Sequence, residues 1–477
     1  MIDSTKALLE ASLKASYKGR LLTEPSDTAP FLLDWRKRYQ GKAIAVAQPA
    51  DTQEVAQIVK WCAENRVPIV AQGGNTGLSG GSVPDSSGRA LVLSLTRMNK
   101  VRAIDTVNNT ITVEAGCILQ NLQDVALKEN RLFGVSLAAK GSCTVGGNLS
   151  TNAGGTQVIR YGNMREQCLG LEVVTAEGEI WDGLRGLRKD NTGYDLRDLF
   201  VGAEGTLGVI TAAVLKLHPL PVGQAVALCA TTSPHQALKL LGLAQKRLGG
   251  SLSGFELMSA ICLELVQRHN PKSKIPFPTA PWTVLVEVSD LNSEALARSS
   301  MQGLLEEAFE AGLIEDATVS QSIAQLKEFW NLREDISEAQ ASEGKNIKHD
   351  IAVPISKIAD FVEQTNAEIH ASHPGIRMVV FGHLGDGNLH YNVSPPADKT
   401  AAEFEDWFMD QQAAINLITH DSVAKFNGSV SAEHGLGVLR RDEAARYKSP
   451  IELALMKKIK NALDPHHLMN PGKVISL

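Results

Sequence analysis

Three stretches of small residues in the first half of the chain constrain its fold more than any other feature. The first, AQGGNTGLSGGSVP at 71–84, follows the apolar run Val67–Val70, and five of its fourteen residues are glycine. A strand that leads into a glycine-rich turn lets the backbone approach a ligand closely and directs several N–H groups at one point, which suits phosphate oxygens. The stretch predicts a pyrophosphate cradle, although a mobile surface loop has the same composition.

The other two stretches strengthen this prediction. GSCTVGGNLSTNAGG at 141–155 and GAEGTLGVI at 202–210 are also built from small, hydroxyl- or amide-bearing residues. Together the three stretches predict loops that wrap along one large phosphorylated ligand. The sequence GGNTGLSGG matches neither GxGxxG at the start of a helix nor the P-loop pattern, so a Rossmann or P-loop site has little support.

Length and charge bound the remaining possibilities. A chain of 477 residues suggests two or three domains, and its net charge of −6 gives no basic footprint for nucleic acid. The first twenty residues include Asp3, Lys6 and Glu10, so they predict an amphipathic helix rather than a signal peptide. No apolar run is long enough for a membrane span. Six scattered cysteines without a CxxC motif indicate reduced thiols in a cytoplasmic compartment.

Apolar periodicity predicts two successive α+β regions. In the first, a strand at 43–47, a helix begun by Asp51 and Glu54, strands at 67–71, 90–94 and 111–115, and a helix at 118–130 are expected. The Pro-rich segment 218–223 is expected to end this domain. Beyond it we expect strands at 224–230, 252–257 and 282–289, helices at 234–248, 260–269, about 292–312 and 322–342, and a tail helix at 449–464. This succession predicts an open antiparallel sheet with helices on one face.

The segment MVVFGHLGDGNLHYNV at 378–393 predicts a hairpin. If its turn is the two residues Asp386 and Gly387, His383 faces His390 across the strands, with Cβ atoms about 4.5–5.5 Å apart. Asn392 lies on the same face as His390. Two imidazoles in this register could bind one metal ion.

Glu433 and His434 could add a carboxylate and a base to this site. Two histidines and one carboxylate, with positions left open, are typical of a catalytic metal site. A packing or surface role for each histidine remains the alternative. Adjacent residues on a regular strand point to opposite faces, so the pair can share a site only if the strand breaks there, and Gly435 favours such a break.

Seven motifs in one order carry a family resemblance. They are PADTQEV (49–55), QGGNTGLSGG (72–81), GSCTVGGNLSTNAGG (141–155), NTGYDLRDLFVGAEGTLGVIT (191–211), GHLGDGNLH (382–390), SAEHG (431–435) and NPGK (470–473). Over nearly its whole length the sequence resembles the vanillyl-alcohol-oxidase-type FAD oxidoreductases, and within them the D-2-hydroxyacid dehydrogenases, which include the D-lactate and D-2-hydroxyglutarate enzymes. The resemblance implies an α+β fold with a two-part PCMH-type FAD-binding domain (41–219) and a ferredoxin-like antiparallel-sheet substrate domain (220–428). An N-terminal helical segment (1–40) and a C-terminal helical segment that returns to the flavin (429–477) would flank them.

The resemblance also assigns residues to the cofactor and the metal. FAD is expected to be held without a covalent bond, because 71–84 contains neither His nor Cys. A divalent metal, expected to be Zn with Mn or Co as alternatives, would bind His383, His390 and Glu433, and His434 would be the catalytic base. The residues expected to contact FAD are Gly73, Gly74, Asn75, Thr76, Gly77, Ser79, Gly80, Ser142, Thr144, Gly147, Asn148, Thr151, Asn152, Gly154, Gly155, Glu204, Gly205, Gly208, Ile210 and Asn470.

Substrate and partners follow from the same resemblance. Arg333, Ser337 and Lys348 match positions that contact the distal carboxylate in the 2-hydroxyglutarate branch, and Asn392 is also expected to bind substrate. The expected reaction oxidises a D-2-hydroxyacid to the 2-oxoacid, with D-2-hydroxyglutarate as the first candidate and D-lactate or glycolate as alternatives. An electron-transfer flavoprotein or a quinone would accept the electrons, and a homodimer is compatible with the family. A zinc hydrolase and a non-catalytic binding protein remain open as other classes.

Overall fold

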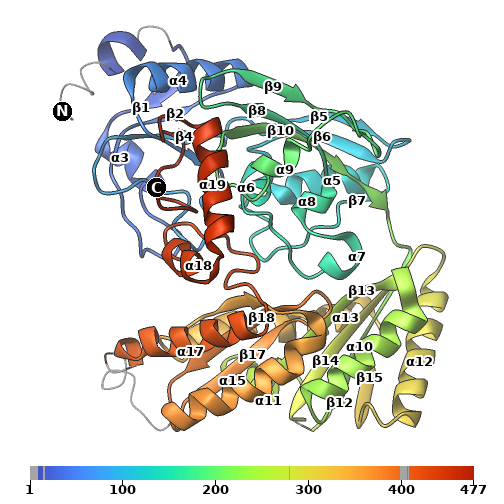
Figure 1. The fold of residues 1–477 in the computed structure, drawn as a ribbon. Helices are drawn as coiled ribbons and strands as arrows, with labels where there is room; N and C mark the ends of the chain where they lie inside the picture. The colour runs from blue at the N-terminus through green and yellow to red at the C-terminus, as the bar shows by residue number, and fades with distance from the viewer. Residues whose placement is uncertain (1–8, 14–16, 279, 398–405, 407) are drawn as a thin grey trace. The chain divides into compact units, whose positions relative to one another are not determined.

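The computed structural model describes residues 9–13, 17–278, 280–397, 406 and 408–477 (Figure 1). The chain forms two compact units, which are described separately. The first unit contains Met1–Gly154, Gly162–Leu220 and Glu433–Leu477, and the second contains Gly155–Tyr161 and Pro221–Ala432. The helix expected over the first twenty residues falls largely outside the described residues. Its described part is one π-helical turn at Leu9–Leu13, followed by strand β1 (Arg20–Leu22).

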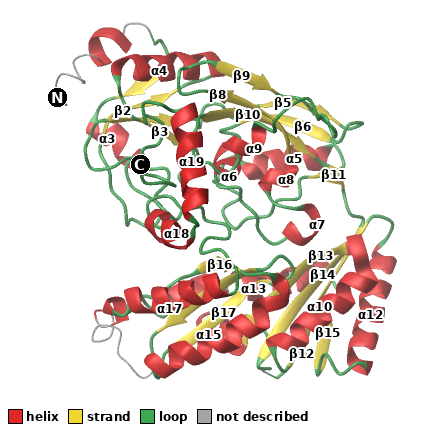
Figure 2. Cartoon of the chain, viewed as in Figure 1, coloured by secondary structure: helices red, strands yellow, loops and turns green. Residues whose placement is uncertain are grey.

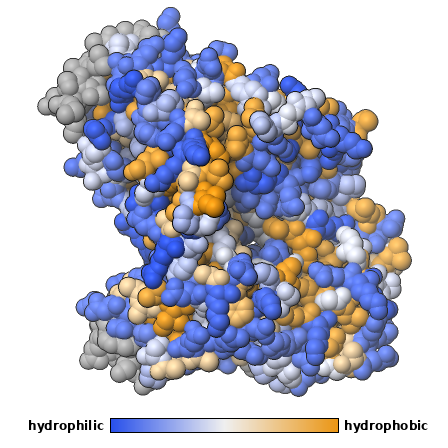
Figure 3. Space-filling model, viewed as in Figure 1, coloured by the Kyte–Doolittle hydropathy of each residue, from blue (hydrophilic) through white to orange (hydrophobic). Residues whose placement is uncertain are grey.

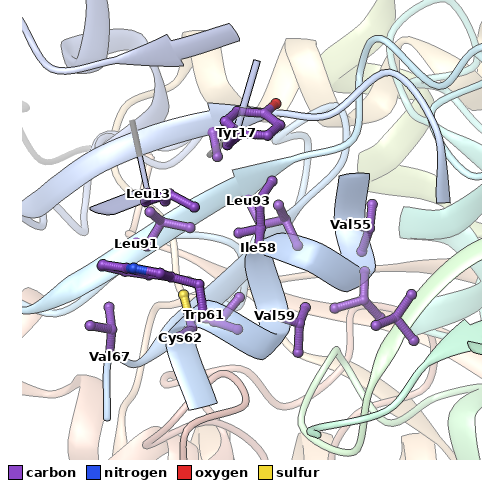
Figure 4. Close-up of a cluster of buried hydrophobic side chains, with 14 of the residues drawn as sticks. Leu13, Tyr17, Val55, Ile58, Val59, Trp61, Cys62, Val67, Leu91 and Leu93 are labelled. Atoms are coloured by element: carbon purple, nitrogen blue, oxygen red, sulfur yellow. The ribbon is translucent and has the colours of Figure 1, made fainter. Parts of the chain in front are cut away.

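The first unit contains a mixed four-stranded sheet. Its order is β1, β2 (Ala43–Gln48), β4 (Ala90–Ser94) and β3 (Ile69–Gln72), and the last three strands are parallel. Helix α4 (Thr52–Asn65) begins at Asp51, whose side chain accepts a hydrogen bond from the backbone N–H of Glu54 at 2.9 Å. Apolar residues of α4 pack against Leu91 and Leu93 of β4, as Figure 4 shows.

A five-stranded antiparallel sheet completes the core of the first unit. Its order is β5 (Val101–Asp105), β6 (Thr110–Glu114), β10 (Val209–Lys216), β8 (Cys168–Val174) and β9 (Ile180–Gly183). The other elements of this unit are α3 (Pro25–Thr28), α5 (Leu119–Lys128), β7 (Arg131–Leu132), α6 (Val145–Ser150), α8 (Met164–Gln167), α9 (Arg197–Phe200), β11 (His218–Pro219), α18 (Arg441–Tyr447) and α19 (Pro450–Leu463). Strands β5, β8 and β9 are absent from the sequence expectations because each is short or lacks a clear apolar alternation.

The second unit is built on a seven-stranded sheet in which all neighbours are antiparallel (Figure 2). Its order is β15 (Asp316–Val319), β12 (Gly223–Thr231), β14 (Trp282–Asp290), β13 (Leu252–Ser259), β17 (Arg377–His383), β18 (Asn388–Ser394) and β16 (Asp350–Ala352). This antiparallel sheet agrees with the sequence expectation for the second half of the chain.

Helices pack against both faces of this sheet, and the expectation of helices on one face is wrong. Helices α10 (Pro234–Leu248), α12 (Glu294–Glu310), α15 (Ile358–Ser372) and α17 (Gln412–Lys425) form one layer. Helices α11 (Ala260–His269), α13 (Ile323–Glu334) and α14 (Ile336–Ser342) form the other, and α7 (Val158–Tyr161) packs on β13. The physical reason is that β12 is apolar and buried on both of its faces, so both need covering.

The surface gives two further facts. Helix α19 exposes Ile451, Leu455 and Ile459 at four-residue spacing, and Figure 3 shows an apolar patch over this helix. Among the described residues, every helix falls short of the length and apolar character that crossing a membrane requires.

Candidate active site

The three small-residue stretches meet in one pocket of the first unit. The pocket has a volume of about 890 Å³, part of it open to solvent. Its lining includes these residues expected to contact FAD: Gly73, Gly74, Asn75, Thr76, Gly77, Ser79, Thr144, Gly147, Asn148, Thr151, Glu204, Gly205, Gly208 and Ile210. Others expected there do not line it, namely Gly80, Ser142, Asn152, Gly154, Gly155 and Asn470, and Gly155 belongs to the second unit. Residues that the sequence did not single out also line the pocket, namely Ala71, Gln72, Gly81, Ser82, Leu95, Ala115, Gly146, Ser150 and Val209.

Close contact between two loops explains why the residues here must be small. A Cβ atom on Gly74 would lie 2.1 Å from the carbonyl oxygen of Ser142, and one on Gly73 would lie 2.3 Å from Oγ1 of Thr144. Neither distance is compatible with a side chain. The first two stretches are therefore packed against each other, and their glycines keep the wall of the pocket thin.

Asn470 provides an unpaired acceptor beside this pocket. Its Nδ2 donates hydrogen bonds to the carbonyl oxygens of Gly81 at 2.9 Å and Glu204 at 2.7 Å. Its buried Oδ1 has no hydrogen-bond partner among the described residues. A buried acceptor without a partner is costly unless a ligand satisfies it. The walls of small residues from three stretches and this buried acceptor together fit a large cofactor such as FAD.

The turn that carries Asn470 is fastened by a buried ion pair. Nζ of Lys460 donates to the carbonyl oxygens of Thr206 at 2.6 Å and Met469 at 2.9 Å, and it pairs with the carboxylate of Asp464. Asp464 in turn accepts the backbone N–H of Met469 at 2.9 Å. These contacts join α19 and the C-terminal turn to the third small-residue stretch. The sequence shows Lys460 and Asp464 only as ordinary helix residues.

Two residues of the pocket hold the segment that carries His434. The carboxylate of Glu204 accepts the backbone N–H groups of Leu436 at 2.7 Å and Gly437 at 2.9 Å. Oγ of Ser79 donates to the carbonyl oxygen of His434 at 3.3 Å, and His434 itself lines the pocket. Burial raises the pKa of Glu204, against the opposing effect of the two N–H groups. The carboxylate of Glu204 thus bonds the backbone near the expected base.

The two histidines of the hairpin lie close together in the second unit, but not in the expected register. Phe381 is directly opposite His390, and the strands end at His383 and Asn388. The connecting loop therefore has four residues, 384–387, and the expected two-residue turn is wrong. The loop is set by tertiary contacts, because Gly385 donates its N–H to the carbonyl oxygen of Phe255 at 3.3 Å.

The histidine pair survives this shift because the error is two residues, which preserves the face of the strand. His383 and His390 are diagonal neighbours, with ring centroids 5.7 Å apart and planes at 78°. His383 is buried and His390 is half-buried. Both imidazoles thus remain on one face of the sheet, as a shared metal ion would require.

Glu256 is the most important residue that the sequence analysis missed. It lies on β13 directly opposite His383, and its side chain is fully buried. Oε1 accepts a hydrogen bond from Nδ1 of His383 at 2.7 Å, and Oε2 accepts one from Nε of Arg333 at 2.7 Å. Burial opposes ionisation of Glu256, but the charges of His383 and Arg333 outweigh it and lower its pKa to about 2. The only sequence signal was a lone acidic residue in the apolar strand LSGFELMS.

The bond to Glu256 fixes the tautomer of His383. Because Nδ1 donates to a carboxylate, the lone pair of the neutral ring lies on Nε2, which is the arrangement of metal-binding histidines. The donor set therefore fits a divalent metal ion such as Zn. Asp350, directly opposite His390 in β16, is a further carboxylate in this region, and its Oδ1 accepts a hydrogen bond from Asn388 at 3.0 Å.

The expected substrate residues fall in different environments. Arg333, near the C-terminal end of α13, is 6% exposed, whereas Ser337 is exposed at the start of α14. The helix expected over 322–342 breaks at Asp335, so Ser337 does not continue the helix of Arg333. Lys348 is half-buried before β16. The side chain of Asn392 donates to Oε1 of Gln340 at 2.9 Å, so part of its hydrogen-bonding capacity is used internally.

Glu433 and His434 lie in a bend, not in a strand. Gly435 has φ of +70°. Because the backbone is not a regular strand here, Glu433 and His434 are not forced to point to opposite faces. In the second unit, the N–H of Ala432 bonds the carbonyl oxygen of Asp350 at 3.2 Å. Glu433 is the next residue and begins the last segment of the first unit.

Comparisons with known proteins agree with this architecture. A family model described as an FAD binding domain matches 43–183, and one described as the C-terminal domain of FAD linked oxidases matches 220–474. The mitochondrial D-2-hydroxyglutarate dehydrogenase of Danio rerio is 38% identical, over 97% of this chain and 84% of its own length. D-2-hydroxyglutarate dehydrogenase of Xanthomonas citri pv. viticola is 39% identical, over 95% and 94%.

One further relative and one solved structure are also similar to this chain. A putative mitochondrial D-lactate dehydrogenase of Schizosaccharomyces pombe is 36% identical, over 95% of this chain and 86% of its own length. The solved structure of p-cresol methylhydroxylase with substrate bound superposes with a TM-score of 0.73 at 15% identity, over 95% of this chain and 93% of that one. This last likeness concerns the fold alone, and it confirms the expected fold class.

Proposed function

Because this chain belongs to the FAD-linked oxidases, we propose that it oxidises a D-2-hydroxyacid to the 2-oxoacid with non-covalently bound FAD. D-2-hydroxyglutarate is the proposed substrate, since relatives that match nearly the whole chain carry that name. The observation that carries the proposal is the position of His434. This imidazole lines the same pocket as the three small-residue stretches, where a base and a flavin would have to meet.

Each step of the proposed reaction can be assigned to a particular group. Bound FAD supplies the acceptor for the hydride that leaves the α-carbon of the hydroxyacid. The backbone and small side chains of the three stretches would hold its phosphates and its flavin, and neutral His434 would take the hydroxyl proton. The segment 434–437, held by Ser79 and Glu204, keeps that imidazole at the pocket wall.

The hydroxyl proton is a poor leaving group at neutral pH, which is the reason to propose a metal. His383, His390 and Glu433 would hold a divalent ion, with Zn first and Mn or Co as alternatives, and that ion would lower the pKa of the hydroxyl. The carboxylate of Glu256 behind His383 supports this assignment, because metal-binding histidines commonly donate their other ring nitrogen to a carboxylate.

Arg333 is the proposed anchor for the distal carboxylate of the substrate, with Lys348 as a second cation. Among the described residues, the Arg333 side chain makes one hydrogen bond, from Nε to Glu256, so its two terminal nitrogens can form a fork for a second carboxylate. Asn392 keeps a smaller proposed role, because its amide already bonds Gln340. The exposure of Ser337 argues against a direct contact with substrate.

Anaerobic mixing of the purified flavoprotein with a panel of D-2-hydroxyacids tests the proposal. We expect D-2-hydroxyglutarate to bleach the flavin absorbance faster than D-lactate or glycolate. Faster bleaching by D-lactate would favour the second candidate, which the relative from Schizosaccharomyces pombe supports. No bleaching by any member of the panel would leave a binding protein rather than an oxidoreductase.

Three finer proposals follow from the same family resemblance. An electron-transfer flavoprotein or a quinone would reoxidise the flavin, and steady-state assays with each acceptor would distinguish them. A homodimer would be seen by light scattering. A cytoplasmic location is supported by six buried cysteines without disulfide bonds, whereas several relatives are named as mitochondrial, and cell fractionation would distinguish the two.

A further inference from the structure

Five side chains of the second unit, Glu256 among them, form a closed ring of contacts. Glu256 bonds His383 through one carboxylate oxygen and Arg333 through the other, each at 2.7 Å. The guanidinium carbon of Arg333 lies 4.7 Å from the ring centroid of Phe381, and the rings of Phe381 and His390 are 4.9 Å apart. The rings of His390 and His383 close the circuit at 5.7 Å.

This ring joins two sites that the proposed function treats as separate. His383 and His390 are the proposed metal ligands of the hairpin, and Arg333 is the proposed substrate anchor on α13. The contacts in the ring that do not involve Glu256 are an edge-on contact, a tilted contact and a cation–π contact between side chains, and these are less directional than a hydrogen bond. The two charge-assisted hydrogen bonds of Glu256 are directional and short, so they set the orientation of both partners.

Burial makes this carboxylate difficult to replace. Glu256 is 0% exposed, Arg333 is 6% exposed and His383 is 5% exposed. A buried carboxylate is costly in an apolar sheet unless its oxygens are bonded, and here each oxygen has its own donor. The next two residues of β13, Leu257 and Met258, are apolar and fully buried, so Glu256 is a charge in an otherwise apolar part of the strand.

We propose that Glu256 is a positioning residue that orients the metal ligand His383 and the substrate anchor Arg333 as one unit. The inference rests on the proposed function, since it assigns these two partners their roles. Glu256 itself would touch neither metal nor substrate. Its loss would therefore weaken metal binding and substrate binding together, although the two sites use different side chains.

Glu256→Gln is the informative variant because an amide has one oxygen acceptor and one NH₂ donor. The amide oxygen of the variant can accept a hydrogen bond from either His383 or Arg333. Its NH₂ group would then face the N–H of the other partner, and two donors cannot form a hydrogen bond. The matched control is Glu287→Gln on the neighbouring strand β14. Glu287 is also buried and accepts hydrogen bonds from Ser253 at 2.6 Å and Trp330 at 2.8 Å. Among the described residues, no hydrogen bond or ion pair joins it to His383 or Arg333.

The experiment measures the affinity of the FAD-loaded proteins for Zn²⁺ and Co²⁺ by competition with a chromophoric chelator. FAD content and thermal unfolding serve as measures of the fold. We expect Glu256→Gln to lower metal affinity about 10-fold or more and to change the visible spectrum of bound Co²⁺. It should also raise KM for D-2-hydroxyglutarate, while Glu287→Gln leaves metal affinity and the Co²⁺ spectrum unchanged.

The outcomes separate this inference from the proposed function. If the wild-type protein binds metal and Glu256→Gln binds it equally well, the positioning role is wrong and the proposed metal dependence stands. If the wild-type protein binds no divalent ion, the metal dependence is wrong and the inference falls with it. If Glu256→Gln does not fold, Arg333→Lys tests the same link, because lysine lacks the Nε–H that holds Oε2. A several-fold loss of metal affinity in Arg333→Lys supports the inference, and an unchanged affinity overturns it.

Discussion

The carboxylate of Glu204 accepts the backbone N–H of Leu436 at 2.7 Å, so a residue of the third small-residue stretch holds the segment that carries His434. Glu204 has φ of +51°, in the left-handed region that residues other than glycine seldom adopt. Such a conformation persists only where the surrounding contacts require it. The two N–H groups of 436–437 supply that requirement.

The first prediction is that Glu204→Gln slows flavin reduction more than it weakens FAD binding. The amide can accept only one of the two N–H groups with its oxygen, so the segment should move and His434 with it. We expect a fall of about 10-fold or more in the rate of flavin reduction, because small misplacements of a base are costly. Stopped-flow absorbance and FAD titration measure the two effects, with exposed Glu177→Gln as control. If FAD affinity falls as much as the rate of flavin reduction, the prediction is wrong and Glu204 acts mainly by contacting the cofactor.

The hairpin illustrates what the sequence can and cannot predict. Alternation of apolar residues identifies both strands, and the His pair is found because a register error of two residues keeps the same face. The prediction of a two-residue turn was wrong. Asp386-Gly387 is a strong local turn signal, but a tertiary contact of the neighbouring Gly385 determines the loop instead. Gly385 packs so closely on Ile159 that a Cβ would lie 2.3 Å from its Cδ1, and no local pattern shows this.

Glu256 and Lys460 mark a second limit. Both are buried charges with partners that local sequence does not show: Glu256 pairs with Arg333 far along the chain, and Lys460 donates to the carbonyl oxygen of Thr206. Neither belongs to a motif. The pocket lining was easier to predict, because three stretches rich in small residues follow one another in the first half of the chain. Motif chemistry thus gives the residues that face a ligand, whereas the residues behind them require the packed structure.

The second prediction is that FAD is bound without a covalent bond. Cys143, the nearest nucleophile in the three stretches, is buried, and burial raises the pKa of its thiol, so it stays protonated and unreactive. Acid precipitation should release the flavin into the supernatant. A pellet that stays yellow after repeated washing would contradict the prediction.

The third prediction concerns metal removal. Chelation should stop flavin reduction and leave FAD bound, because the pocket of the three stretches and the His383–His390 pair belong to different units. His383→Ala and His390→Ala should behave alike, because each loses bound metal. His434→Ala should keep its metal, but its flavin should be reduced much more slowly. Metal analysis and flavin absorbance on the same samples measure both. Full-rate reduction by chelated protein would exclude a catalytic metal.

The fourth prediction concerns the stability of the second unit at low pH. Glu343 bonds His269 at 2.7 Å, Arg268 at 2.9 Å and Arg377 at 2.9 Å. Its partial burial opposes ionisation, but these hydrogen bonds outweigh it and lower the pKa from 4.5 to about 2. Because the folded pKa lies below the unfolded one, the carboxylate stabilises the fold above the unfolded value. That contribution is lost as pH falls from 4.5 towards about 2.

Glu343→Gln isolates this contribution. We expect the variant to have a lower Tm than the wild type near neutral pH, corresponding to about 1–3 kcal/mol after allowance for solvent screening. The gap should shrink at about pH 3, because the carboxylate of the unfolded chain is then largely protonated while that of the folded protein is still largely ionised. The control is Glu338→Gln, an exposed residue of α14, the helix that ends just before Glu343. This variant should leave Tm unchanged at both pH values. A gap that does not depend on pH would mean that packing, not charge, accounts for the loss.

The last prediction concerns the choice of substrate. A dicarboxylate such as D-2-hydroxyglutarate needs a second anchor that D-lactate does not need, and the free fork of Arg333 is the proposed anchor. Arg333 also bonds Glu256, so a substitution would disturb the proposed metal site as well as the proposed anchor. That disturbance acts on the common reacting centre and should affect both substrates alike. The ratio of kcat/KM for the two substrates, measured with saturating metal, therefore isolates the anchor.

We expect Arg333→Ala to lower kcat/KM for D-2-hydroxyglutarate about 10- to 100-fold more than for D-lactate, which corresponds to the loss of hydrogen bonds to a charged group. Arg333→Lys should restore only part of the ratio, because an ammonium group cannot form the planar fork. Lys348→Ala should move the ratio in the same direction if it is the second cation. Equal losses on both substrates would place Arg333 in the support of the reacting centre alone, and the distal carboxylate would then need another partner in the second unit.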